Sequence, residues 1–268
     1  MTMPTNHLYA QWVSQLAALL LPIDGPAIIG ITGAQGTGKS TLAARLAKQL
    51  TAQGRPTAAV SLDDYYLNRT QRQQLAKQVH PLLAQRGVPG THRIEQALDD
   101  AHNFLQGKAV AWPHFDKALD EPGSPCSPQK AELLLVEGWC LGLAPQSDQA
   151  LQQPINALEH QQDADGRWRR YVNQQLTAAY ADYWQLLKPL IWLQAPDWQT
   201  VCRWRQKQEQ QLWQQRGMGM SKAQLAQFML SFERLTLASW QQLPSRADLQ
   251  IQLDHQQQPI TTVIINSW

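Results

Sequence analysis

The sequence is poor in charged residues and in cysteine. Only 16% of its 268 residues are charged, and 23 basic against 21 acidic side chains leave a net charge of +2. So small an excess provides no basic surface for nucleic acid or for an anionic membrane. Cys126, Cys140 and Cys202 are an odd number at wide, irregular spacing. This argues against a disulfide framework or a zinc motif and fits a reducing compartment.

The chain also lacks the segments that direct proteins to or through membranes. No Lys or Arg precedes Lys39, so the basic region of a signal peptide is missing. No apolar run reaches the roughly 20 residues that a membrane-spanning helix needs. We therefore expect a cytoplasmic protein with no membrane or nucleic-acid partner. The sequence leaves the oligomeric state open.

Its hydrophobic content of 43%, which includes 11 Trp, is enough to bury a sizeable core. Short apolar runs bounded by Gly, Pro or polar residues are typical of buried strands. Strands separated by long helical stretches predict βαβ units and a doubly wound sheet. The predicted strands cover residues 27–32, 57–62, 133–136 and 190–193, followed by a closing pair at 249–253 and 260–265.

Apolar residues at helical spacing predict the layers around this sheet. A stripe through Trp12, Leu16 and Leu20 predicts an amphipathic helix over residues 5–21. The Pro- and Gly-rich segment 63–132 predicts an irregular insertion over the carboxyl edge of the sheet. Since no repeat or clear linker divides the chain, we expect a single domain over residues 1–268. Further helices are predicted at 40–50, 94–105, 177–187, 197–216 and 221–243.

A phosphate-binding motif lies between the first predicted strand and the helix after it. Residues 33–40 satisfy the pattern GxxxxGK[ST]. The glycines let backbone N–H groups turn inward at a helix N-terminus, where the helix dipole favours an anion. In such loops the lysine reaches the β- and γ-phosphates, and the hydroxyl of the next residue binds Mg²⁺. The predicted ATP-binding residues are Gly33, Ala34, Gln35, Gly36, Thr37, Gly38, Lys39, Ser40 and Thr41.

Acidic residues follow two of the predicted strands. Glu137 ends an apolar strand, the usual place for a carboxylate that holds Mg²⁺, although a strand-terminal Glu can also simply face solvent. Asp63 and Asp64 follow the strand 57–62, where ligands bind in open α/β sheets. A carboxylate there can accept the proton of an attacking hydroxyl. We assign that role to Asp63, and to Asp64 a helix cap or a water-mediated metal contact.

Two other classes of P-loop protein fit less well. The Asn-Lys-x-Asp motif by which GTPases read their base is missing from the sequence. Residues 163–166 match the GTPase pattern D-x-x-G, but no predicted strand precedes them. An ABC-type ATPase would need a signature segment that the chain also lacks. These absences favour a kinase, with ATP rather than GTP as the nucleotide.

The ordered motifs of the chain resemble those of the D-glycerate 3-kinase group. This group belongs to the superfamily of phosphoribulokinase, uridine kinase and pantothenate kinase. The resemblance implies a three-layer αβα sandwich with a mostly parallel five-stranded sheet. It also implies transfer of the γ-phosphoryl group of MgATP to a hydroxyl of a small molecule. The motifs that carry it are GAQGTGKST (33–41), SLDDYY (61–66), RGVPGTH (86–92), WPHFDKA (112–118), LLLVEGW (133–139) and CRWRQKQE (202–209).

The resemblance also implies roles for individual residues. Asp63 takes the position of the general base, and Glu137 and Ser40 that of the magnesium ligands. Arg203 and Arg205 lie where related kinases have a lid helix whose arginines close on the phosphates. The implied lid region covers residues 197–220. The alternative for each arginine is a solvated side chain that contributes little.

The same resemblance places an acceptor pocket around the insertion. Arg93 departs from the group, which usually has Asp after Gly-Thr-His. The exchange reverses the local charge and favours a more anionic acceptor than glycerate, unless Arg93 braces the helix 94–105. Tyr65 fits packing at least as well as ligand contact. The candidate acceptor residues are Asp64, Tyr65, Arg86, His92, Arg93, His114 and Asp116.

Two alternatives to a glycerate kinase remain at this point. The chain could be a nucleotide-dependent binding or regulatory protein, although such a switch would not need Asp63 as a hydroxyl base. It could also phosphorylate a nucleoside or a pantothenate-like molecule.

Overall fold

A computed structural model describes residues 4–216 and 219–266 of the chain. Its centre is a six-stranded sheet with the order β2-β5-β1-β6-β7-β8. The predicted parallel sheet is confirmed, and the antiparallel β8 adds one strand to its five parallel ones. The strands are β1 (Ala27–Gly33), β2 (Thr57–Ser61), β5 (Leu133–Gly138), β6 (Leu187–Gln194), β7 (Leu249–Leu253) and β8 (Pro259–Ile264).

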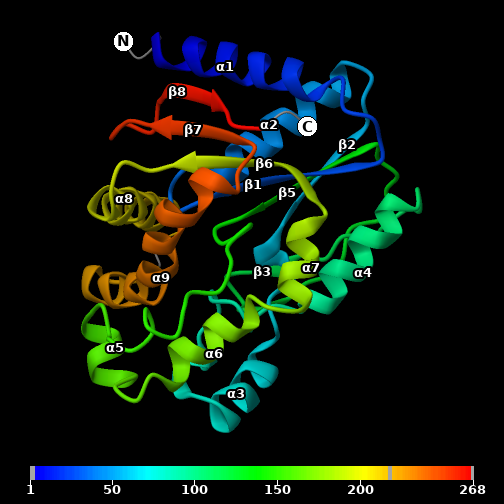
Figure 1. Ribbon diagram of the computed structural model, residues 1–268. Helices are drawn as coiled ribbons and strands as arrows, with labels where there is room; N and C mark the ends of the chain where they lie inside the picture. The colour runs from blue at the N-terminus through cyan, green and yellow to red at the C-terminus, as the bar shows by residue number, and fades with distance from the viewer. Residues whose placement is uncertain (1–3, 217–218, 267–268) are drawn as a thin grey trace.

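Helices cover both faces of this sheet, which confirms the three-layer arrangement (Figure 1). α1 (Pro4–Leu20) and α2 (Lys39–Ala52) lie on one face, and α4 (Ile94–Leu105) and α7 (Ala179–Gln185) on the other. α8 (Trp198–Arg216) and α9 (Lys222–Gln242) form a pair that follows β6. The predicted lid region 197–220 therefore contains α8, but residues 217–218 lie outside the described part of the chain.

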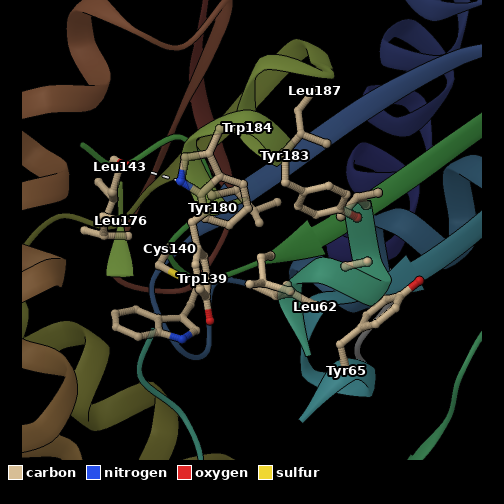
Figure 2. Packing of buried hydrophobic residues seen from close by; sticks show 14 of the residues in the cluster. Leu62, Tyr65, Trp139, Cys140, Leu143, Leu176, Tyr180, Tyr183, Trp184 and Leu187 are labelled. Atoms are coloured by element: carbon tan, nitrogen blue, oxygen red, sulfur yellow. Dashed lines mark hydrogen bonds between the residues drawn. The ribbon is translucent and has the colours of Figure 1, made fainter. Parts of the chain in front are cut away.

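The core is divided by the sheet because successive strand residues point to opposite faces. Ile28 packs on the side of α4 and α7, whereas Ile29 and Ile31 pack on the side of α1 and α2. A parallel strand buried on both faces needs apolar residues at every position, which explains the continuous apolar runs in the sequence. Figure 2 shows the first side, where aromatic rings such as Tyr180 and Trp184 pack around the sheet.

The segment 63–132 is less irregular than its composition predicts. Besides the predicted α4 it contains the helix α3 (Arg69–Gln78) and the 3₁₀ turns η1 (Leu62–Tyr65) and η2 (Pro81–Ala84). α3 is rich in Gln and buries mainly the side chain of Arg72, so it has no apolar stripe to reveal it. A short antiparallel pair, β3 (Phe115–Asp116) and β4 (Glu121–Pro122), forms a hairpin in the same segment.

Three further short elements complete the described chain. α5 (Ala157–Gln162) and α6 (Arg167–Gln175) lie in the polar stretch after β5, and η3 (Leu243–Ser245) follows α9. Buried ion pairs hold α5 and α6 in place: Glu159 pairs with Arg234 of α9, and Asp163 pairs with Arg169. Within the described ranges, every helix is too short or too polar to cross a membrane.

Candidate active site

A cavity of about 470 Å³ opens beside the carboxyl ends of β1, β2 and β5. In open α/β sheets this is the edge at which ligands bind. The P-loop, the segment after β2 and the end of β5 all contribute to its wall. The predicted site residues that line it are Gln35, Gly36, Gly38, Lys39, Ser40, Thr41, Asp63, Arg86, Glu137 and Arg205.

The P-loop has the backbone conformation that its sequence predicts. Gly36 and Gly38 have φ angles of 80° and 89°, a left-handed region that favours glycine. A Cβ atom on Gly36 would lie 2.7 Å from Cβ of Trp204, so this glycine also lets α8 pack against the loop. A Cβ atom on Gly38 would meet nothing within 4 Å. Gly38 therefore serves the turn into α2 and leaves space above the helix N-terminus for an anion.

Lys39 begins α2 and lies beside two carboxylates. Its Nζ donates a hydrogen bond of 3.0 Å to the carbonyl of Ala34. Burial lowers the pKa of Lys39, and the charges of Glu137 and Asp63 offset part of this effect. Gly33, Ala34 and Thr37 are buried under the loop and do not line the cavity.

Ser40 and Glu137 meet at the bottom of the cavity. Ser40 Oγ donates a hydrogen bond of 2.9 Å to Glu137 Oε1, and Glu137 is only 8% exposed. Oxygen ligands of this kind suit Mg²⁺, which usually keeps several waters and takes one or two protein ligands plus nucleotide phosphates. Among the described residues, no group of three or more His, Cys, Asp or Glu side chains is placed so that it could hold a metal ion. Ser40 and Glu137 thus provide two oxygen atoms of the kind that Mg²⁺ binds.

Asp63 points into the cavity with both carboxylate oxygens engaged. Tyr66 donates a hydrogen bond of 2.8 Å to Oδ1, and Lys117 Nζ lies 2.7 Å from Oδ2. Burial alone would raise the pKa of Asp63, but the ammonium group of Lys117, the hydrogen bond from Tyr66 and the nearby His92 together hold this pKa below its ordinary value. Asp63 is therefore an anion at neutral pH and can accept a proton only from a group held directly against it.

Tyr66 and Lys117 are site residues that the sequence analysis missed. Both belong to quoted motifs, SLDDYY and WPHFDKA, and both line the cavity. Lys117 belongs to the turn between β3 and β4, 54 positions after Asp63. Burial alone would lower the pKa of Lys117, but the charge and hydrogen bond of Asp63, with the charges of Glu137 and Asp64, together raise it. The motif alone could have marked both residues as candidates, but only the fold brings them to Asp63.

His92 lies behind this group and is not among the residues that line the cavity. Its ring stacks on that of Tyr66 with centroids 4.6 Å apart, and its Nδ1 lies 2.8 Å from the hydroxyl of Tyr180. Burial lowers the pKa of His92 to about 4, so the imidazole is neutral at neutral pH. Its geometry suits support of Tyr66 better than contact with an acceptor.

Arg86 lines the cavity but already has two partners in the hairpin β3–β4. One guanidinium nitrogen donates to Asp120, and the other donates to the carbonyl of Lys117 at 3.3 Å. Arg72, which is fully buried, donates to the same Asp120 carboxylate. The two arginines thus anchor the hairpin beside the cavity.

The remaining candidate acceptor residues lie outside the cavity wall. Asp64 accepts a hydrogen bond of 3.1 Å from the backbone N–H of Phe115 and lies 3.5 Å from His114 Nδ1. It caps no following helix, because Asn68 caps α3. Asp116 accepts from the N–H groups of the hairpin turn.

Tyr65 and Arg93 support the core and the start of α4. The buried Tyr65 donates a hydrogen bond of 3.0 Å to Asp100. Arg93 donates to Gln96 at 2.6 Å and to the carbonyl of Asp64 at 3.3 Å. Neither side chain lines the cavity.

The two candidate arginines of α8 differ in their position relative to the cavity. Arg205 lines the cavity and pairs with Glu209 at 2.6 Å. Arg203 points elsewhere and donates to the hydroxyl of Thr200. An apolar wall of Trp139, Phe228 and Phe232 completes the cavity, and Trp139 donates through Nε1 to the carbonyl of Gly87 at 2.9 Å.

Known proteins share this sequence and arrangement. The chain is 31% identical over 221 residues to the "uncharacterized kinase mug58" of Schizosaccharomyces pombe, which is 78% of this chain and 79% of that protein. It is 25% identical over 257 residues to the chloroplastic D-glycerate 3-kinase of Arabidopsis thaliana. That match covers 88% of this chain and 54% of the plant protein. No family model matches the chain.

Solved structures confirm the fold. The YGR205w protein superposes with a TM-score of 0.70 at 23% identity and covers 97% of this chain and 96% of its own. The D-glycerate 3-kinase of Cryptococcus neoformans superposes with a TM-score of 0.68 at 24% identity, over 96% of this chain and 98% of its own. By its sequence similarity to the mug58 kinase and the plant D-glycerate 3-kinase, the chain belongs to the D-glycerate 3-kinase-like group of P-loop kinases and is a phosphotransferase.

Proposed function

We propose that this kinase transfers the γ-phosphoryl group of ATP to a hydroxyl of a small hydroxylated acid, with D-glycerate as the first candidate. The observation that carries the proposal is the shared cavity: the P-loop with Lys39 and the carboxylate of Asp63 line the same space. Phosphoryl transfer needs this juxtaposition of a phosphate cradle and a group that accepts the hydroxyl proton.

The residues support a direct transfer. Asp63 would accept the proton of the acceptor hydroxyl while the oxygen of that hydroxyl bonds to the γ-phosphorus. The bond from that phosphorus to the oxygen that bridges it to the β-phosphate breaks, and ADP leaves. Lys39 and Arg205 would stabilise the charge on the phosphates from two sides. Ser40 and Glu137 would hold Mg²⁺, which neutralises phosphate charge when it is bound.

The charge of the cavity wall favours an acid over a neutral acceptor. Lys117, which pairs with Asp63, and Arg86, which donates to the carbonyl of Lys117, both line the cavity. Two relatives are named D-glycerate 3-kinase, and D-glycerate has both a hydroxyl for Asp63 and a carboxylate for a cation.

The proposal is tested by ADP release with D-glycerate, uridine and pantothenate as acceptors. We expect D-glycerate to be the best of the three. Asp63→Asn keeps the size but cannot take the proton, so it should lower turnover by about 100-fold or more and retain ATP binding. The matched control Asp64→Asn should lose far less, because an amide oxygen can still accept the N–H of Phe115.

Two results would contradict the proposal in different ways. Uridine as the best acceptor would make the chain a nucleoside kinase. ATP binding without transfer to any acceptor would favour the nucleotide-dependent regulatory protein.

A further inference from the structure

Each carboxylate oxygen of the candidate base Asp63 already accepts one hydrogen bond in the arrangement described above. The hydroxyl of an acceptor must approach the Asp63 carboxylate from the cavity, where Lys117 Nζ lies 2.7 Å from Oδ2. Tyr66 already donates to Oδ1. Each oxygen can accept a second hydrogen bond, so a hydroxyl that approaches from the cavity shares the carboxylate with one of these two donors.

Of the two partners, Lys117 is the one that can leave. The ring of Tyr66 is buried, stacks on His92 and meets Phe115 edge-on with centroids 5.4 Å apart. The side chain of Lys117 is 57% exposed and has four rotatable methylene groups. A movement of Lys117 needs only a change of rotamer, whereas a movement of Tyr66 would disturb packed rings.

The backbone of Lys117 stays beside the cavity when its side chain moves. Its carbonyl accepts from Arg86, and Arg86 is paired with Asp120 of the same hairpin. The N–H of Phe115 donates to Asp64 at the other end of the turn. An ammonium group that turns away from Asp63 therefore stays beside the cavity, where it can pair with an anionic group of a bound ligand.

We propose that Lys117 determines the specificity for the acceptor by exchanging Asp63 for the acid group of the acceptor. This inference rests on the proposed function. A hydroxy acid whose acid group is one or two carbons from the reacting hydroxyl can place its hydroxyl on Asp63 and its carboxylate on Lys117. The number of ion pairs is then unchanged. A neutral acceptor provides no acid group for Lys117, so Lys117 stays paired with Asp63 and the hydroxyl shares that carboxylate.

The test compares D-glycerate with glycerol, which keeps the hydroxyls and lacks the carboxylate. Both are titrated by calorimetry into protein loaded with a non-hydrolysable ATP analogue and Mg²⁺, and kcat/KM is measured with ATP. Lys117→Met should weaken D-glycerate binding on the order of 10- to 100-fold, the loss of one charge-assisted hydrogen bond. Glycerol binding should be unchanged or improved.

Two variants make the test specific. Lys117→Arg keeps the positive charge and should retain part of the preference for D-glycerate. Lys130→Met removes an exposed lysine that does not line the cavity and should behave as wild type.

Each outcome separates the inference from the proposed function. Unchanged D-glycerate affinity in Lys117→Met, or an equal loss for D-glycerate and glycerol, overturns the inference while the kinase assignment stands. Lys117-dependent binding of D-glycerate without phosphoryl transfer supports the inference and overturns the proposed function. A wild-type protein that does not bind D-glycerate overturns both.

Discussion

Ser40 of the P-loop and Glu137 at the end of β5 are 97 positions apart in the chain and share a hydrogen bond of 2.9 Å. The bond joins the two elements that together would hold Mg²⁺. It forms because β1 and β5 are neighbours in parallel register, so Ile31 lies beside Glu137 and the loop after β1 meets the carboxylate.

The first prediction concerns the charge of Glu137. In Glu137→Gln the amide oxygen can still accept from Ser40, but the charge that attracts Mg²⁺ is gone. We expect the Mg²⁺ concentration for half-maximal turnover to rise by about 10- to 100-fold. Calorimetric titration of ADP with and without Mg²⁺ gives an independent readout. In the variant, the affinity for ADP should be the same under both conditions. An unchanged Mg²⁺ dependence in both measurements would remove Glu137 from the metal site.

The second prediction concerns pH. Asp63 faces Lys117, Tyr66, Lys39 and, behind Tyr66, the neutral His92. Its lowered pKa means that it stays ionised as pH falls, so kcat/KM should stay flat until pH drops below the ordinary range for Asp of about 4. In Lys117→Met, burial is no longer outweighed, so the pKa of Asp63 should rise and the acidic limb should move toward neutral pH.

The measurement is kcat/KM for one acceptor over about pH 4 to pH 9 in wild type and Lys117→Met. The two profiles are compared over the pH range in which both proteins stay folded. Profiles of the two proteins that superimpose down to the lowest pH measured would show that Lys117 does not control the protonation of the base.

The third prediction separates the two arginines of α8. Arg205→Ala should lower kcat by roughly 100-fold, because a cation in the cavity that stabilises the transferring group is lost. Arg203→Ala should change kcat little, because Arg203 contacts Thr200 outside the cavity. Since Arg205 also pairs with the buried Glu209, melting temperatures must be measured beside kcat and the KM for ATP. A larger loss of kcat in Arg203→Ala would reverse this assignment.

The parts of the fold that were predictable from sequence are those that the core dictates. Buried parallel strands need unbroken apolar runs, so the strand predicted at 27–32 differs from β1 by a single residue. The P-loop needs glycine at fixed positions, so its residues could be read directly. α3, α5 and α6 were missed because they are polar and lack an apolar stripe of the length that periodicity detects. The capping box of Asn68 and Gln71 was a usable signal for α3.

The candidate site was predictable on its nucleotide side and much less so on its acceptor side. The phosphate cradle is local in sequence, whereas the acceptor side depends on a hairpin that returns to Asp63 from 54 positions away. From the motif WPHFDKA, sequence reasoning chose His114 and Asp116 and passed over Lys117, because it could not tell which side of the hairpin each residue faces. Lys117 faces the cavity, whereas Asp116 of the same motif accepts N–H groups of the turn.

The last prediction concerns Arg93, the position at which this chain departs from its family. Arg93 immediately precedes α4, and its guanidinium bridges Gln96 and the carbonyl of Asp64. This arrangement fits a brace for the start of the helix rather than a ligand for the acceptor. A cation is unfavourable at a helix N-terminus, whereas Asp is favourable there and a preferred cap. The substitution Arg93→Asp thus removes two hydrogen bonds, adds a helix cap and places a favourable negative charge at the N-terminus of α4.

We expect Arg93→Asp to leave the ranking of D-glycerate, a phosphorylated acid and uridine unchanged, as measured by kcat/KM. Its melting temperature should lie above that of Arg93→Ala, which loses the same two hydrogen bonds and gains no cap, a difference of about 1 kcal/mol in the free energy of unfolding. Comparison of the two variants isolates the cap, because both remove the guanidinium. A changed acceptor ranking in both would instead place Arg93 in the working site. If the ranking changed only in Arg93→Asp, the new carboxylate itself would be acting on the acceptor, and the helix-brace account would still hold for the native arginine.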